Sequence, residues 1–328
     1  MVFQSGIVHS FVKDAFWIGD HLICLHWGAQ ISVYFLCHAS GGSLLLRDSF
    51  AFTPYKWSIC AAQLSENLFL LHGMKEQKLQ LVELQLETSK LNFTTTLWEF
   101  PIRCGGADSL LRISNGTIVS GHANGFVNIW KCNDDQNAPV PLTVELSHIP
   151  TESNSKLICI RCLESYNEKM FFAGSESGMI YLLDIQGNQL RRFWSSTKLG
   201  INSLSFKDRF LLIGVCKDTG EDYNTVFFEM TDEKSYLFTR RAAFFFGDSA
   251  SSAKFIYQVK MLSTDLFLAS CGNGALVLNK VKDPPEIIQQ LLPTCEGGLA
   301  LALPVQQSKP FLAAVSQDLK LISMNNYP

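Results

Sequence analysis

Hydrophobic and polar residues alternate along short stretches of this chain, and small or polar residues separate one stretch from the next. The clearest example is the segment 117–131, TIVSGHANGFVNIWK, in which an apolar run ends in small residues and an alternating run begins at Phe126. Between the two runs stands Asn124-Gly125, a pair that tolerates the positive φ angles of a type I′ turn. The segment therefore predicts a β-hairpin with Gly125 at positive φ.

The same pattern returns along the whole chain, with a second Asn-Gly pair at Asn273-Gly274. The seven copies lie at 21–36, 67–84, 117–131, 170–185, 209–229, 266–281 and 310–323. Their turns are marked by Gly28, Gly73, Gly125, Gly178, Gly220, Gly274 and Asp318. Successive markers are 45, 52, 53, 42, 54 and 44 residues apart, a spacing typical of propeller blades and too long for leucine-rich, ankyrin or tetratricopeptide repeats.

Each hairpin has apolar segments on both sides, which completes four strands per repeat. Segments 157–163 and 201–208 precede hairpins, and segments 142–149 and 236–246 follow them. The chain 1–328 therefore predicts one all-β domain, a seven-bladed β-propeller with four-stranded antiparallel blades. Only 284–292, PPEIIQQLL, has the apolar spacing of a helix, and it is short.

Two repeats resemble the WD-repeat family in their motifs. In the third repeat the matching residues are Ser120, Gly121, Asn124, Gly125, Ile129 and Trp130, with Lys131 in the place of the usual Asp. In the fourth they are Ala173, Gly174, Ser175, Gly178 and Asp184, with Leu183 in the place of Trp. The Gly-His pair that opens a typical WD repeat is absent, and His122 lies within a hairpin instead. The sequence is thus similar to a divergent WD-repeat propeller, in which packing is expected to replace the usual polar network.

The resemblance also implies a way to close the ring. In this family the N-terminal strand completes the last blade, and residues 2–12 precede the first hairpin while the chain stops soon after the seventh. We therefore expect residues 2–12 to supply the fourth strand of the seventh blade, which removes an exposed sheet edge.

Composition and charge narrow the class of protein. The chain is 47% hydrophobic, so it has enough apolar surface for a large core, and its net charge of −3 offers no basic surface for nucleic acid or anionic lipid. No secretory signal and no apolar run of membrane-spanning length are visible. We expect an intracellular protein of the cytoplasm or nucleus, with ten reduced cysteines and with no membrane insertion.

No group of residues has the spacing of a known catalytic or metal site. Cys159 and Cys162 form the only CxxC, and a zinc site needs two further ligands. The seven histidines have neither metal-ligand nor catalytic-triad spacing, and the Gly-Gly pairs form no phosphate-binding loop. We expect no cofactor, no metal and no catalytic activity. The alternative is a propeller hydrolase or lyase with a metal or sugar site at the central channel, for which Asp108, Asp248 and Glu296 are the candidate mouth residues.

The leading hypothesis is a non-catalytic scaffold or adaptor subunit of a eukaryotic multiprotein complex. Nuclear-pore, RNA-processing or modification, ubiquitin-ligase and trafficking assemblies are the partner classes that the resemblance implies, and nucleic acid would be contacted only indirectly. Aromatic and Arg side chains dominate binding hot spots. The candidate partner-binding residues are Arg240, Arg241, Phe244, Phe245 and Phe246. A second candidate contact region is 132–155, which has polar and proline-rich ends.

Overall fold

A computed structural model describes the chain in sixteen segments. They are residues 2–7, 12–26, 30–37, 43–51, 60–72, 78–132, 139–146, 159–195, 200–215, 224–244, 256–271, 276–281, 286–292, 300–302, 311–315 and 318–323. Apart from one 3-10 turn, η2 (Ile102–Cys104), every regular element in these segments is a β-strand.

Six consecutive groups of four strands form antiparallel sheets, the first to sixth blades. The first blade contains β2 (Val12–Ile18), β3 (His21–His26), β4 (Gln30–Cys37) and β5 (Ser43–Ala51). The second contains β6 (Cys60–Gln63), β7 (Leu68–His72), β8 (Lys78–Gln85) and β9 (Lys90–Glu99). The third contains β10 (Ala107–Ser114), β11 (Thr117–His122), β12 (Phe126–Lys131) and β13 (Leu142–Glu145).

The fourth blade contains β14 (Ile160–Asn167), β15 (Met170–Ser175), β16 (Met179–Asp184) and β17 (Gln189–Trp194). The fifth contains β18 (Ile201–Lys207), β19 (Phe210–Val215), β20 (Thr225–Asp232) and β21 (Leu237–Phe244). The sixth contains β22 (Ile256–Met261), β23 (Leu266–Cys271), β24 (Leu276–Lys280) and β25 (Glu286–Leu292). A further four-stranded sheet has the order β1-β28-β27-β26, formed by β1 (Val2–Ile7), β26 (Ala300–Ala302), β27 (Phe311–Val315) and β28 (Asp318–Ser323).

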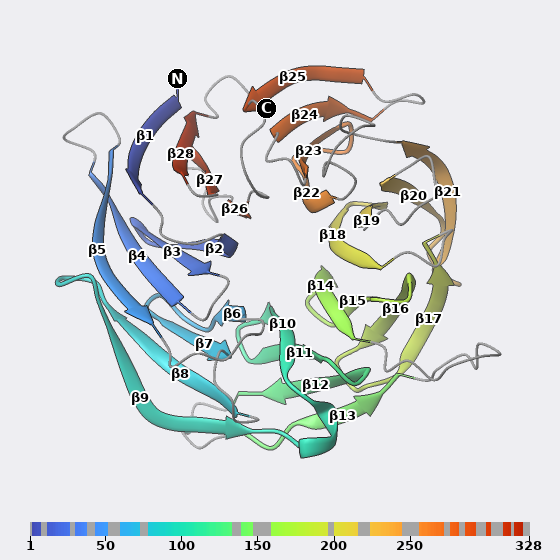
Figure 1. Ribbon diagram of the computed structural model, residues 1–328. Helices are drawn as coiled ribbons and strands as arrows, with labels where there is room; N and C mark the ends of the chain where they lie inside the picture. The colour runs from blue at the N-terminus through green and yellow to red at the C-terminus, as the bar shows by residue number, and fades with distance from the viewer. Residues whose placement is uncertain are drawn as a thin grey trace.

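The sheets stand round a common centre (Figure 1). In the first six blades the first strand lies inside and the fourth lies at the rim, and in the further sheet β26 lies inside and β1 at the rim. The prediction of an all-β propeller with four-stranded antiparallel blades is therefore confirmed. The predicted hairpins are the two middle strands of their sheets. The segment with helical spacing is instead the strand β25, paired to β24. Seven residues make too few internal hydrogen bonds for a stable helix, whereas pairing with β24 satisfies the backbone.

The hairpin of the third blade has the predicted glycine geometry but a different turn. Gly125 has φ 79°, as predicted, and its N–H donates to the carbonyl of His122 at 3.3 Å. Asn124 is not among the residues with positive φ, so the type I′ expectation is wrong. The loop is longer by one residue, Ala123, and forms a type I turn followed by a left-handed glycine. Gly178 has the same conformation at φ 87°, and Gly274 lies outside the described residues.

The hydrophobic core consists of layers between successive blades. One cluster joins the first and second blades through Ile23 and Phe69, and another joins the fourth and fifth through Phe172 and Ile213. Middle strands such as β3, β11 and β23 are buried on both faces, which explains their near-continuous apolar runs.

Close contact between blades requires glycine at one repeated position. Gly121, Gly174 and Gly214 each precede the last residue of the second strand, and each faces the first residue of the next blade's inner strand. A Cβ on Gly121 would lie 2.6 Å from the Ile160 side chain, and one on Gly214 would lie 2.7 Å from Ile256. The isoleucine occupies the volume that the glycine leaves empty.

The third blade contains a buried polar network, contrary to the expectation that packing alone holds the blades. Trp130 Nε1 donates to Ser120 Oγ at 2.9 Å, and Ser120 Oγ lies 2.9 Å from His122 Nε2. His122 Nδ1 lies 3.2 Å from the Gly105 carbonyl, which can only accept. Nδ1 therefore carries the proton, and Nε2 accepts from Ser120 and from Asn128 Nδ2 at 2.9 Å. The histidine of this network comes from the hairpin itself.

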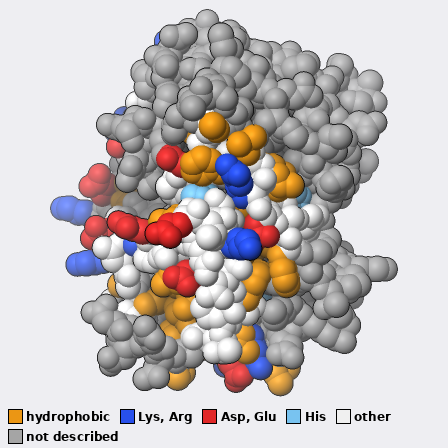
Figure 2. All heavy atoms as spheres, turned by 90° about the vertical axis from the view of Figure 1, so that its left-hand side faces the viewer, with side chains coloured by type: hydrophobic (Ala, Val, Ile, Leu, Met, Phe, Trp, Pro, Cys, Tyr) orange, Lys and Arg blue, Asp and Glu red, His pale blue; other side chains and the backbone are white. Residues whose placement is uncertain are grey.

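The rim exposes several large apolar side chains. Leu45, Leu46 and Phe50 of β5 are 42%, 52% and 41% exposed. Figure 2 looks at the side on which β5 and β9 lie, and its coloured part has hydrophobic side chains interspersed with acidic and basic ones. Among the described residues, no helix is long and apolar enough to span a membrane.

Candidate functional site

Five inner strands share a β-bulge directly after their first residue. In β14, for example, Ile160 pairs with Ser175 and Cys162 with Gly174, so Arg161 is the extra residue. The corresponding extra residues are Lys13, Asp108, Arg161, Asn202 and Tyr257. Bulges redirect side chains and are frequent beside functional sites. All five residues line one central cavity of about 520 Å³.

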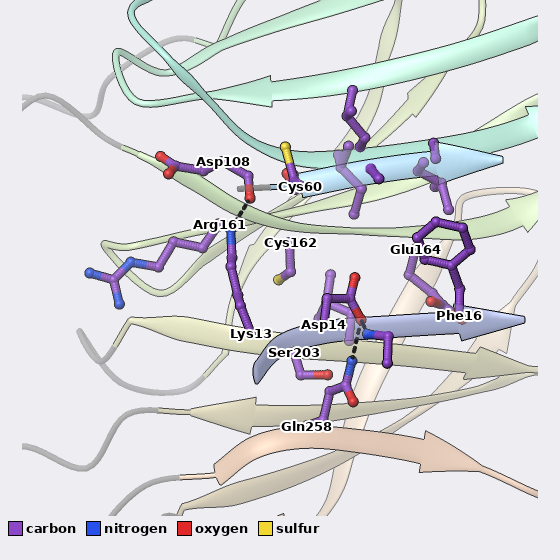
Figure 3. Close-up of a pocket in the computed structure, with 18 of the residues that line it drawn as sticks. Lys13, Asp14, Phe16, Cys60, Asp108, Arg161, Cys162, Glu164, Ser203 and Gln258 are labelled. Atoms are coloured by element: carbon purple, nitrogen blue, oxygen red, sulfur yellow. Dashed lines mark hydrogen bonds between the residues drawn. The ribbon is translucent and has the colours of Figure 1, made fainter. Parts of the chain in front are cut away.

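Hydrogen bonds link two pairs of the bulged residues beside this cavity, and Figure 3 shows the link between Lys13 and Asp108. Lys13 Nζ donates to the backbone carbonyl of Asp108 at 2.9 Å. Arg161 pairs with Glu176 at 2.5 Å and donates from Nη1 to Asn202 Oδ1 at 3.4 Å. Asn202 Nδ2 then donates to the Ile256 carbonyl at 3.0 Å. The mouth is therefore a polar ring built from inner strands of several blades.

Two carboxylates and one ammonium group lie farther along the same strands. Asp14 Oδ1 accepts from the Ala15 N–H at 2.9 Å and from Gln258 Nε2 at 3.3 Å. Glu164 Oε1 accepts from a backbone N–H at 3.2 Å, and its Oε2 lies 3.9 Å from Lys260 Nζ. Burial raises the pKa of both carboxyls, and the Lys260 charge partly opposes that increase. The cavity thus holds charges of both signs and can take a small polar group.

The cysteines beside the cavity are not activated nucleophiles. Cys159 Sγ donates to Asp108 Oδ2 at 2.6 Å, and burial together with the Asp108 charge raises the pKa of this thiol. Cys162 points toward Gly174 and its pKa is also raised by burial. All eight cysteines in the described segments are free thiols, and these segments bring together no group of three His, Cys, Asp or Glu that could hold a metal.

The structure places only part of the predicted partner-binding stretch. Arg240 and Arg241 lie on β21 and both are exposed. Arg241 Nε pairs with Glu229 Oε2 at 2.5 Å, so it is anchored rather than isolated on the surface. The backbone of Phe244 ends β21, while Phe245 and Phe246 lie outside the described residues. In the region 132–155, residues Leu142–Glu145 form the outer strand β13.

Of the three acidic residues predicted at the channel mouth, Asp108 lies in the cavity, and Asp248 and Glu296 fall outside the described segments. Sequence reasoning missed Arg161, Glu164 and Lys260. A signal for the ring was present, since the inner strands begin with an apolar residue and then a polar one, as in Val12-Lys13 and Ile160-Arg161. Alignment of the strands that precede the hairpins would have revealed it.

The fold and this cavity define the chain as a β-propeller of four-stranded antiparallel blades with a central cavity lined in part by charged and polar side chains. No protein-family model matches the sequence, and a search of curated proteins returns no match.

Proposed function

We propose that this protein is a non-catalytic scaffold, an intracellular adaptor subunit that holds other proteins of a eukaryotic complex. The observation that carries the proposal is the exposure of three large apolar side chains, Leu45, Leu46 and Phe50, on the nine-residue edge strand β5. Apolar side chains gathered at a polar-rimmed surface commonly mark protein contacts. A rigid ring of blades is suited to presenting such surfaces.

We further propose that the chain is a divergent WD-repeat propeller with seven blades, closed by its N-terminal strand. Two observations support closure. β1 pairs antiparallel with β28, from Val2 opposite Ile322 to Ile7 opposite Asp318. β26, at the other edge of that sheet, lies against β2 and also contacts β22. The Trp130–Ser120–His122 network supports the family relationship, since it links the strands of a blade through polar side chains.

Deletion of residues 1–12 tests the closure. Loss of β1 exposes the edge of β28, so we expect aggregation or a large fall in the midpoint of thermal unfolding. The measurement is differential scanning calorimetry together with size-exclusion chromatography. A soluble truncated chain with an unchanged, cooperative transition would show that this segment does not close the ring.

Affinity purification of the tagged full-length chain, with identification of the bound proteins, tests the scaffold proposal. Leu45→Ser and Leu46→Ser should release partners that bind at β5 with little change in the unfolding midpoint, because both side chains are exposed. Val140→Ser is the matched control, because Val140 is 90% exposed and precedes a strand of another blade. We expect specific, stoichiometric partners with the wild-type chain and their loss with the β5 variants. Purification of a lone monomer would contradict the proposal.

The channel supports a second candidate function, a hydrolase or lyase that binds a metal or sugar. The favouring observation is the convergence of Asp14, Glu164 and Lys260 in the central cavity. Metal analysis of the purified chain, with and without chelator, and calorimetric titration with simple sugars distinguish the two functions. Stoichiometric metal or saturable sugar binding, abolished by Glu164→Gln, would favour the enzyme.

A further inference from the structure

One carboxylate of the fifth blade pairs with two arginines. Glu229 lies on β20, Arg241 on the neighbouring strand β21, and Arg209 in the turn between β18 and β19. Arg209 Nη2 lies 2.7 Å from Glu229 Oε1, and Arg241 Nε lies 2.5 Å from Oε2. Each carboxylate oxygen therefore pairs with a different guanidinium group.

Burial divides this cluster into an inner and an outer part. The Glu229 side chain is only 12% exposed, whereas those of Arg209 and Arg241 are 60% and 52% exposed. The Arg209 guanidinium also lies over the ring of Phe210 at 5.3 Å, and that ring stacks on Phe227 at 5.2 Å. The largely buried carboxylate thus holds two guanidinium groups in place, and both of these groups are exposed to solvent.

Both guanidinium groups keep hydrogen-bond donors for a further acceptor. Arg241 uses Nε for Glu229, which leaves both of its Nη groups directed elsewhere. Within the described segments, no second acceptor hydrogen-bonds to either guanidinium group. Two positive charges share one negative charge, so a single external carboxylate would neutralise the surplus and reduce the repulsion between the two arginines.

We propose that Arg209 and Arg241, positioned by Glu229, bind a carboxylate of an acidic segment in a partner polypeptide. This inference rests on the proposed scaffold function, for which it names the chemistry of one partner. A peptide fits because the side chains of both arginines are more than half exposed and neither residue lines the central cavity. Planar guanidinium groups match a carboxylate through paired hydrogen bonds, and the two arginines are already fixed before binding.

Fluorescence anisotropy of the full chain tests the proposal, with a labelled peptide in which Glu alternates with Ser as the probe. The corresponding Gln-Ser peptide and a phosphoserine peptide are the comparison ligands. We expect the Glu peptide to bind at least about tenfold tighter than the Gln peptide at low ionic strength. Arg209→Gln and Arg241→Gln should each abolish that difference. Arg191→Gln, the same charge change on β17, should preserve it.

Glu229→Gln separates positioning from general electrostatic attraction. Removal of a negative charge strengthens general attraction for an anionic peptide, whereas loss of the positioning carboxylate weakens binding at the proposed site. We expect weaker binding, and Arg241→Lys, which keeps the charge and loses the planar fork, should also bind more weakly. Tighter binding by Glu229→Gln, wild-type binding by Arg241→Gln, or preference for the phosphoserine peptide would overturn the proposal. Partners that are retained by the Arg241→Gln chain would leave the scaffold function standing.

Discussion

The third blade and the layer between the fourth and fifth blades are stabilised by different side-chain interactions. In the third blade, Trp130, Ser120 and His122 form a fully buried hydrogen-bonded chain. The layer between the fourth and fifth blades contains aromatic rings instead. Phe172 lies 5.3 Å from Phe206 and 5.6 Å from Phe238, measured between ring centroids.

This difference shows that the same strand pairing is compatible with different side-chain interactions. Both regions have the same four-stranded antiparallel frame, so the frame does not depend on a polar network. A polar network fixes geometry through directed hydrogen bonds and is costly when one member is removed. An aromatic layer derives its stability from buried area and is sensitive to lost volume. The two regions should therefore respond to different perturbations.

The largest effect is expected from loss of volume in the aromatic layer. Phe172→Ala removes a ring that is fully buried and surrounded by other rings, so the free energy of unfolding should fall by about 3–5 kcal/mol. Chemical denaturation measures the change. Phe172→Leu is the control and should cost clearly less, because it fills most of the volume. Equal losses for both variants would mean that volume does not control this layer.

Acid should weaken the polar network of the third blade. Burial lowers the pKa of His122 to about 4 from an ordinary value of 6.5. Between these values the unfolded chain binds a proton that the folded chain does not, so stability is full above pH 6.5 and falls as the pH drops toward 4. From pH 7 to pH 4.5 the His122 contribution should fall by about 2–3 kcal/mol.

Denaturant titrations at the two pH values measure that fall. The His122→Gln chain lacks the titrating ring, so its loss between the same pH values should be smaller by this amount. His72 also has a pKa lowered by burial and contributes to the remainder in both proteins. An identical pH dependence of wild type and variant would remove His122 from the explanation.

Loss of the central hydroxyl should break the polar network without creating a large cavity. Ser120→Ala leaves Trp130 Nε1 without its acceptor and removes one hydrogen-bond donor from His122 Nε2, so we expect a loss of about 1–3 kcal/mol. Trp130→Phe in the Ser120→Ala background should cost less than in the wild type, since the indole N–H is then already unpaired. A double-mutant cycle gives this coupling, and strict additivity would contradict a shared network.

The smallest effect is expected at the turn of the same hairpin. Gly125 has φ 79°, a conformation that a β-branched residue strongly disfavours, so Gly125→Val should cost on the order of 1 kcal/mol or more. Gly125→Asn should cost less because Asn tolerates this region. Urea denaturation of both variants measures the difference, and a neutral Val variant would be inconsistent with the observed turn.

Part of the fold could be predicted because its signals are local. Alternating segments such as 126–131 and the turn at Gly125 reveal a hairpin within a few residues, and repetition of the hairpin reveals the propeller. The predicted type I′ turn was wrong because the loop has one more residue than that turn allows. Residues 286–292 form a strand because they pair with β24. The candidate partner-binding stretch was predicted from its residue types alone, which could not reveal that Arg241 pairs with Glu229 of the neighbouring strand.

The sequence by itself determined the strand period, the repetition of the hairpin and the turns at Gly125 and Gly178, since each depends on neighbours along the chain. Tertiary structure alone decided the contacts between blades. Lys13 reaches the carbonyl of Asp108 across 95 residues, and Gly214 leaves room for Ile256 of the next blade. The polar ring exists because the bulges of several inner strands turn their extra residues toward one centre, and no local pattern specifies which side chains will meet there.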